Sequence, residues 1–167
     1  MSAVHAQPTG AAFDVVLLLH VACVVVGLVT TATAAATAGR LRRSLGSDAP
    51  VPEPLRRYYR PGVNWAGRAV YGIPVFGFAL LALSRGAYAL ADGWVLAGLV
   101  LFALVAVVCE VVLWPAERRL QQAVAEAGDG PLAPAAVGGR DALVTARAAQ
   151  LALLLLVVGT VVMVAQP

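Results

Sequence analysis

Four long blocks of apolar residues constrain the fold of this chain more than any other feature of its sequence. Crossing about 30 Å of hydrocarbon takes about 20 apolar residues in a helix with a rise of about 1.5 Å per residue. Hydrocarbon offers the backbone no water to bond with, so each block must form a helix. We therefore predict an all-α fold, a four-helix transmembrane bundle within a single integral membrane domain over residues 1–167. The predicted helices cover about residues 13–38, 66–88, 93–114 and 142–165.

The composition excludes the ordinary soluble classes of protein. Hydrophobic residues make up 60% of the chain and charged residues 13%, whereas a typical soluble domain has about 45–50% and about 25%. Cys23 and Cys109 lie in separate apolar blocks, and the sequence has no Cys-x-x-Cys pair. A thiol–disulfide membrane enzyme is therefore not indicated.

The first block also resembles a secretory signal peptide, because small residues fill positions 33–38. A signal peptide begins with a positively charged region, yet residues 1–12 contain no Arg or Lys. Arg40, Arg42 and Arg43 follow the block instead, as basic residues follow a stop-transfer helix. We expect this block to be a retained membrane helix.

The arginines are distributed unevenly between the two sides of the predicted bundle. All twelve basic residues are arginines, and eleven lie in or beside two long connections, about residues 39–65 and 115–141. Only Arg85 belongs to the short connection between the second and third blocks. Connections rich in basic residues stay in the cytoplasm. We therefore expect the long connections on the inner side and both termini on the outer side.

Three features bear on how the helices pack. The connection over residues 84–92 is so short that the second and third helices are expected to be antiparallel neighbours. Pro74 lies inside the second block and predicts a bend. Residues 30–38 are rich in Ala and Thr, which allows the close approach of another helix, either within the bundle or from a partner protein.

Three ionisable residues fall inside the predicted helices at a similar depth, near the inner boundary: Arg68, Glu110 and Arg147. Such residues are costly in a bilayer and are candidates for functional sites. We predict a structural ion-pair cluster in which Glu110 bonds Arg68 or Arg147 and holds three helices in register. The functional alternatives are a site for an anionic headgroup and a proton relay.

His20 is the second candidate site residue. A histidine inside a membrane can bind haem iron or another metal, and haem is the cofactor that this residue suggests. No other histidine lies in a predicted helix, however, and Met163 lies at a different depth. A lone histidine is also consistent with a hydrogen bond to a neighbouring helix and no cofactor at all. No metal site and no catalytic motif are predicted from the sequence.

Three segments carry a resemblance to a known family, and they read LLHV (18–21), YRPGVNWA (59–66) and LWPAERR (113–119). They resemble an uncharacterised family of predicted bacterial integral membrane proteins, a domain of unknown function with four helices. The family is distantly similar to the copper-resistance D-type and J-type protoporphyrinogen oxidase membrane domains, and the oxidases use haem. Only His20 matches those domains as a cofactor residue. The chain lacks their second membrane histidine, and it has no Met-rich or His-rich copper motif.

The sequence favours a small non-enzymatic protein of the bacterial cytoplasmic (inner) membrane, acting as an accessory or scaffold subunit of a larger complex, respiratory or transport. Its expected partners are membrane lipids and either that complex or further copies of the chain, with no nucleic acid. The first alternative is a haem-binding or redox membrane protein that uses His20. The second is a carrier of lipid or a small solute built around Arg68, Glu110 and Arg147.

Overall fold

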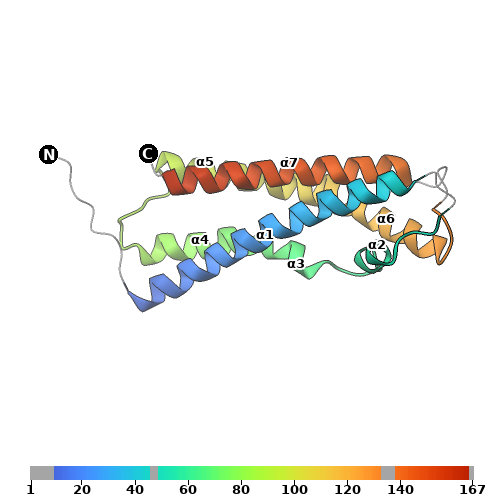
Figure 1. Ribbon diagram of the computed structural model, residues 1–167. Coiled ribbons are helices and arrows are strands. Elements are labelled where there is room, and N and C mark those ends of the chain that lie inside the picture. The colour runs from blue at the N-terminus through green and yellow to red at the C-terminus, as the bar shows by residue number, and fades with distance from the viewer. Residues whose placement is uncertain (1–9, 46–48, 133–137, 166–167) are drawn as a thin grey trace.

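Helices make up most of the described chain (Figure 1). The computed structural model describes residues 10–45, 49–132 and 138–165. These ranges contain no strand, so the all-α prediction is confirmed. The elements are α1 (Ala11–Ser44), α2 (Glu53–Tyr58), α3 (Trp65–Arg68), the 3-10 turn η1 (Ala69–Tyr71), α4 (Gly72–Leu83), α5 (Gly93–Val107), the π-helical turn η2 (Val108–Leu113), α6 (Trp114–Ala127) and α7 (Gly138–Ala165).

Within the described residues, four helical segments are long and apolar enough to cross a membrane, as predicted. The first is α1, the second combines α3, η1 and α4, the third combines α5, η2 and α6, and the fourth is α7. The third segment continues past the predicted end to Ala127. The second ends at Leu83, earlier than predicted, because Arg85 and Gly86 have φ angles of 52° and 87° that no α-helix contains.

Two prolines coincide with irregular turns in the second and third spans. Pro74 has no N–H to donate to the carbonyl of Val70, and η1 lies at that point. Pro115 has no N–H for the carbonyl of Val111, and the turn before it widens into η2. The N–H of Trp114 therefore donates to the carbonyl of Cys109, five residues earlier, instead of four. The irregularity before Pro74 is thus a tightened turn, and the expected bend stays a prediction.

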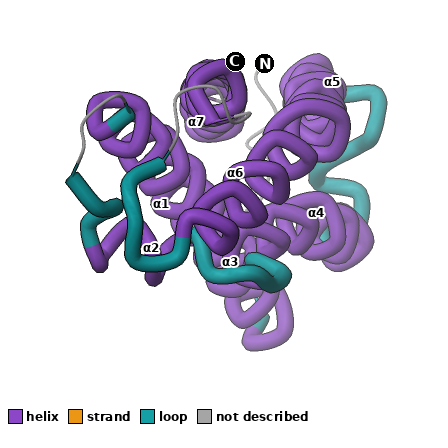
Figure 2. The backbone as a smooth tube through the Cα atoms, turned by 90° about the vertical axis from the view of Figure 1, so that its right-hand side faces the viewer, coloured by secondary structure: helices purple, strands orange, loops and turns teal. Residues whose placement is uncertain are grey.

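The end view shows α7 lying between α1 and α5 (Figure 2). α7 packs against α1, α5, η2 and α6, and α1 packs in addition against α3, η1 and α4. α4 and α5 run antiparallel, as expected, but their backbones make few contacts. The ring of Tyr71 bridges this seam, with its centroid 6.4 Å from that of Phe102 and 5.8 Å from that of Trp114.

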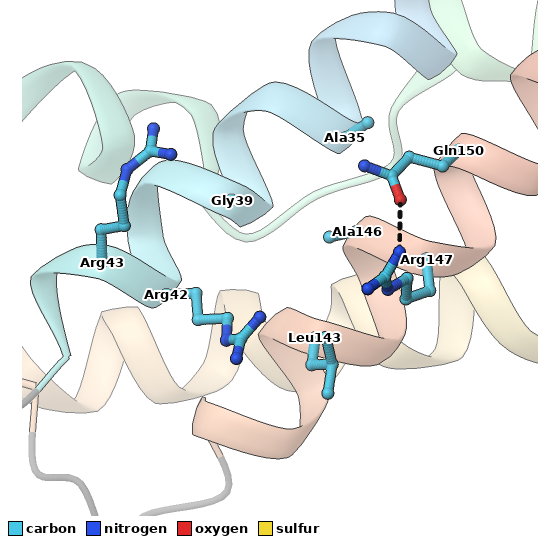
Figure 3. Close-up of a pocket in the computed structure, with 8 residues that line it drawn as sticks. All are labelled: Ala35, Gly39, Arg42, Arg43, Leu143, Ala146, Arg147 and Gln150. Atoms are coloured by element: carbon cyan, nitrogen blue, oxygen red, sulfur yellow. Dashed lines mark hydrogen bonds between the residues drawn. The ribbon is translucent and has the colours of Figure 1, made fainter.

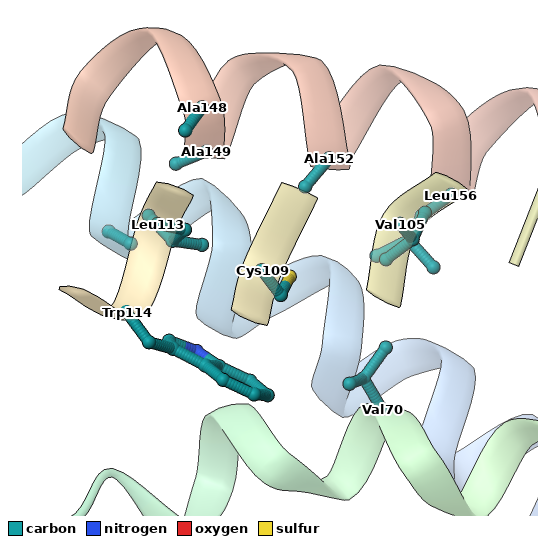
Figure 4. Packing of buried hydrophobic residues seen from close by; sticks show 10 residues of the cluster. Val70, Val105, Cys109, Leu113, Trp114, Ala148, Ala149, Ala152 and Leu156 are labelled. Carbon is teal, nitrogen blue, oxygen red and sulfur yellow. The ribbon is translucent and has the colours of Figure 1, made fainter. Parts of the chain in front are cut away.

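Small residues on α7 allow the third span to pack closely against it (Figure 4). Ala149 and Ala152 are fully buried and face η2, where Cys109 fills the space between the helices. Trp114 lies between the start of α6 and the second span. The buried members of this cluster are Ala34, Val70, Val105, Cys109, Leu113, Trp114, Ala148, Ala149, Ala152 and Leu156.

A second hydrophobic cluster lies at the arginine-rich end, where α2 packs beside α6 and the end of α1. Tyr59, Leu41 and Leu120 are its largest fully buried side chains. Its other buried members are Val51, Leu55, Ala123, Val124, Leu132 and Ala142. The described parts of the long connections are therefore folded against the bundle.

The start of α1, the end of α7 and the turn between α4 and α5 lie at one end of the molecule, opposite α2 and α6 (Figure 1). We expect alkaline phosphatase fused at the C-terminus to be active, because the arginine-poor end should face outward. The same enzyme inserted at Gly128, beyond α6, should be inactive, whereas a fluorescent protein there should fold. The reverse pattern of activities would contradict this orientation.

Gly72 of α4 lies where the second span comes closest to α1. A Cβ at Gly72 would lie 3.3 Å from Cys23 Cβ and impossibly close to its Sγ. We expect Gly72→Ala to destabilise the protein by about 1–3 kcal/mol through overpacking, measured by thermal unfolding in one detergent. Cys23→Ala in that background should recover part of the loss.

Gly27→Ala is the matched control for this substitution. Its Cβ would meet Leu156 and Val70 at 3.7 Å, an ordinary contact, and alanine favours a helix over glycine. Equal losses of stability at Gly27 and Gly72 would contradict the packing described for α1 and α4.

Candidate functional site

Glu110 lies in η2, and its side chain is exposed on the surface of the third span. The wider turn directs the side chains of Cys109 and Leu113 into the core, whereas that of Glu110 points outward. Its Oε1 accepts a hydrogen bond from the hydroxyl of Tyr71 in η1. This bond links the two irregular turns across the seam between the second and third spans.

Arg68 of α3 lies next to this pair and contacts an aromatic ring instead of a carboxylate. Its guanidinium carbon is 4.5 Å from the centroid of the Trp114 ring, which is a cation–π contact. Trp114 in turn packs edge-on against Tyr71. Arg68, Tyr71, Glu110 and Trp114 thus form one connected group, which we call the Glu110 cluster.

The Glu110 cluster differs from the ion-pair cluster predicted from the sequence. Among the described residues, no ion pair joins Glu110 to Arg68 or Arg147. Arg147 lies elsewhere, on the side of α7 that faces α1, and its Nη1 is 3.5 Å from Oε1 of Gln150. The three side chains therefore do not converge, because each helix has its own rotation about its axis.

His20 connects the first and second spans. Its Nδ1 is 2.9 Å from the carbonyl oxygen of Ile73, the residue before Pro74. The imidazole ring lies beside Gly77, where a Cβ would be 3.5 Å from Cε1 of the ring. Met163 lies instead against Gly98 on the other pair of helices. The hydrogen bond to a neighbouring helix is thus present, and haem binding stays a prediction.

A further polar group lies at the arginine-rich end of the bundle. Glu117 of α6 is only 6% exposed, and its Oε1 accepts a hydrogen bond of 3.1 Å from the hydroxyl of Tyr58 in α2. Burial, and then the adjacent Glu117 carboxylate, raise the pKa of Tyr58 far above its usual value, so this hydroxyl remains a donor. The interaction holds α2 against α6.

An ion pair at the same end joins α6 to the first turn of α7. Nε of Arg119 donates to Oδ1 of the buried Asp141 at 2.9 Å. In the part of the chain that is described, no three His, Cys, Asp or Glu side chains gather as a metal site would require.

The contacts at the arginine-rich end were not predicted from the sequence, because they join segments that lie far apart along the chain. A signal was available in the segments over residues 59–66 and 113–119, which carried the family resemblance. Both segments lie at the hydrogen bond between Tyr58 and Glu117, because Tyr58 directly precedes the first segment and Glu117 belongs to the second.

A family model described as "Predicted integral membrane protein (DUF2269)" matches residues 14–167. The match confirms the predicted membrane family over nearly the whole chain. Neither the curated proteins nor the solved structures contain a match to this chain. The distant similarity to copper-resistance and oxidase domains therefore stays a prediction.

We expect His20→Ala to lower stability by about 1 kcal/mol, because a hydrogen bond between two spans is lost. His20→Gln should recover part of that loss, since its amide can donate to the Ile73 carbonyl. Thermal unfolding in detergent measures both. An absorption spectrum with a Soret band that disappears in both variants would instead assign His20 as a haem ligand.

Proposed function

This chain belongs to the DUF2269 family of predicted integral membrane proteins, and we propose that it is an accessory or scaffold subunit of a larger complex in the bacterial inner membrane, respiratory or transport. The observation that supports the proposal is the outward-facing carboxylate of Glu110. The arginine-rich end of the bundle faces the cytoplasm in this proposal, and both termini face outward.

An exposed carboxylate within a membrane span is energetically unfavourable unless other protein covers it. Insertion scales assign about 2.5–3.5 kcal/mol to a charged side chain at mid-helix, and such residues nearly always face a protein interior or water. A carboxylate has about four acceptor positions, and Tyr71 donates to one oxygen of Glu110. Arg68, the cation beside it, contacts Trp114 instead. The remaining acceptor capacity suits a donor from a second protein.

The surroundings of Glu110 match a helix–helix interface in a membrane. Val107 and Val111 flank it and are 58% and 68% exposed, so an apolar surface surrounds one polar point. A transmembrane helix with small residues and one Arg, Lys, Asn or Gln side chain would complement that surface. We infer that such a helix belongs to the partner subunit.

The Ala- and Thr-rich part of α1 is less suitable as this interface. Thr31, Ala34 and Ala38 are buried within the bundle itself. The exposed Thr33 directs its hydroxyl to the carbonyl of Val29 in its own helix, at 2.8 Å. The buried small residues of α1 therefore serve contacts inside the protein.

The proposal is tested by substituting Val107 with Trp, one turn from Glu110. A bulky ring there should separate the partner helix and reduce recovery of the complex at least tenfold, which corresponds to about 1.4 kcal/mol. Complexes extracted from native membranes in a mild detergent are resolved on native gels and identified by mass spectrometry. Val161→Trp on α7, at a residue that is 60% exposed, is the matched control.

Three results of this experiment decide the matter. A stoichiometric partner that is lost in Val107→Trp and kept in Val161→Trp supports the accessory subunit. A wild-type chain that migrates alone overturns the proposal. Bands at multiples of the 17.1 kDa chain and without other proteins would replace it with a homo-oligomer.

A further inference from the structure

An open groove lies between the last turns of α1 and the first turns of α7, at the arginine-rich end (Figure 3). Its volume is about 410 Å³. Ala35, Gly39 and Ala146 form its floor, where the absence of long side chains leaves the space open. Polar side chains surround the floor: Arg42 and Arg43 from α1, and Arg147 and Gln150 from α7.

Among the described residues, no acidic side chain forms an ion pair with the guanidinium groups of this groove. Figure 3 shows Arg42 and Arg147 extending from opposite helices into the same space, while Arg43 points away along the rim. The ion pairs that the described ranges contain involve Arg56, Arg57 and Arg119 and none of the groove arginines. The groove therefore presents concentrated positive charge that no described carboxylate neutralises through an ion pair.

The groove is continuous with the apolar surface of the membrane span. Gln150 at its edge is followed on α7 by Leu151 and Leu154, which are 46% and 58% exposed. Leu154 lies one turn from Gln150 on the same side of the helix. A molecule with an anionic head and an apolar tail would match both surfaces at once, whereas a free phosphate ion would match only the first.

We propose that this groove binds the phosphate headgroup of an anionic phospholipid. Guanidinium groups bind phosphate through paired, charge-assisted hydrogen bonds, and basic pockets between transmembrane helices are suited to anionic headgroups. Arg42 and Arg147 bind the phosphate from two sides, Arg43 strengthens the local field, and the acyl chains lie along α7. The assignment stands apart from the partner proposed at Glu110, because the two surfaces share no residue.

The test uses the full-length protein in phosphatidylcholine nanodiscs with and without phosphatidylglycerol. Native mass spectrometry measures the fraction of protein that retains one phosphatidylglycerol molecule after release. We expect the double variant Arg42→Gln/Arg147→Gln to weaken phosphatidylglycerol binding at least tenfold. Arg60→Gln/Arg118→Gln is the control, because it removes the same charge from two exposed arginines of the same end that do not line the groove.

Equal weakening in the control variant would overturn the proposal, because net charge alone would then explain binding. Retention of phosphatidylcholine to the same extent would overturn it as well. Displacement of the lipid by inorganic phosphate at moderate concentration would show an ion site instead of a lipid site.

If the double variant fails to fold, Arg147→Lys tests the proposal in its place, since it keeps the charge but loses the paired hydrogen bonds. We expect Arg147→Lys to bind less phosphatidylglycerol while its size-exclusion elution profile stays unchanged. Unaltered binding of phosphatidylglycerol would contradict the proposal.

Discussion

Hydrocarbon supplies no hydrogen bonds to the backbone, and the rest of the structure depends on this constraint. It makes each span a helix and restricts any irregularity to a single turn. Near Pro74 the chain tightens into η1, and before Pro115 it widens into η2. The two irregular turns meet in space, because Tyr71 of η1 donates to Glu110 of η2. The polar site within the membrane thus lies where two helices depart from regular geometry.

The number of helices and their approximate ranges could be predicted from the sequence, because both follow from the thickness of a bilayer. The ends of the helices depended on local detail. The second span stops at Leu83 because of the backbone conformation at Arg85 and Gly86, which an apolar window does not register. The third span continues to Ala127 and ends where Gly128 adopts a positive φ angle of 55°.

The candidate site was harder to predict than the fold, for a geometric reason. Counting residues gives the depth of a side chain in the membrane, and it placed Arg68, Glu110 and Arg147 near one level. The direction of each side chain depends on the rotation of its helix, and η2 changes that rotation within a span. Arg147 consequently faces α1 instead of Glu110. The contacts of Trp114 with Arg68 and of Tyr71 with Glu110 could not be predicted either, because they depend on the same rotations.

The wide turn η2 also determines how the two halves of the third span are set against each other. A π-helical turn contains one residue more than the α-helical turn it replaces. Deleting a single residue there would rotate α6 by about 100° relative to α5. Glu117 would then leave Tyr58, and Arg119 would leave Asp141. The extra residue sets the rotation of α6 relative to α5. It lets α5 pack against α7 while the side chains of α6 reach Tyr58 and Asp141.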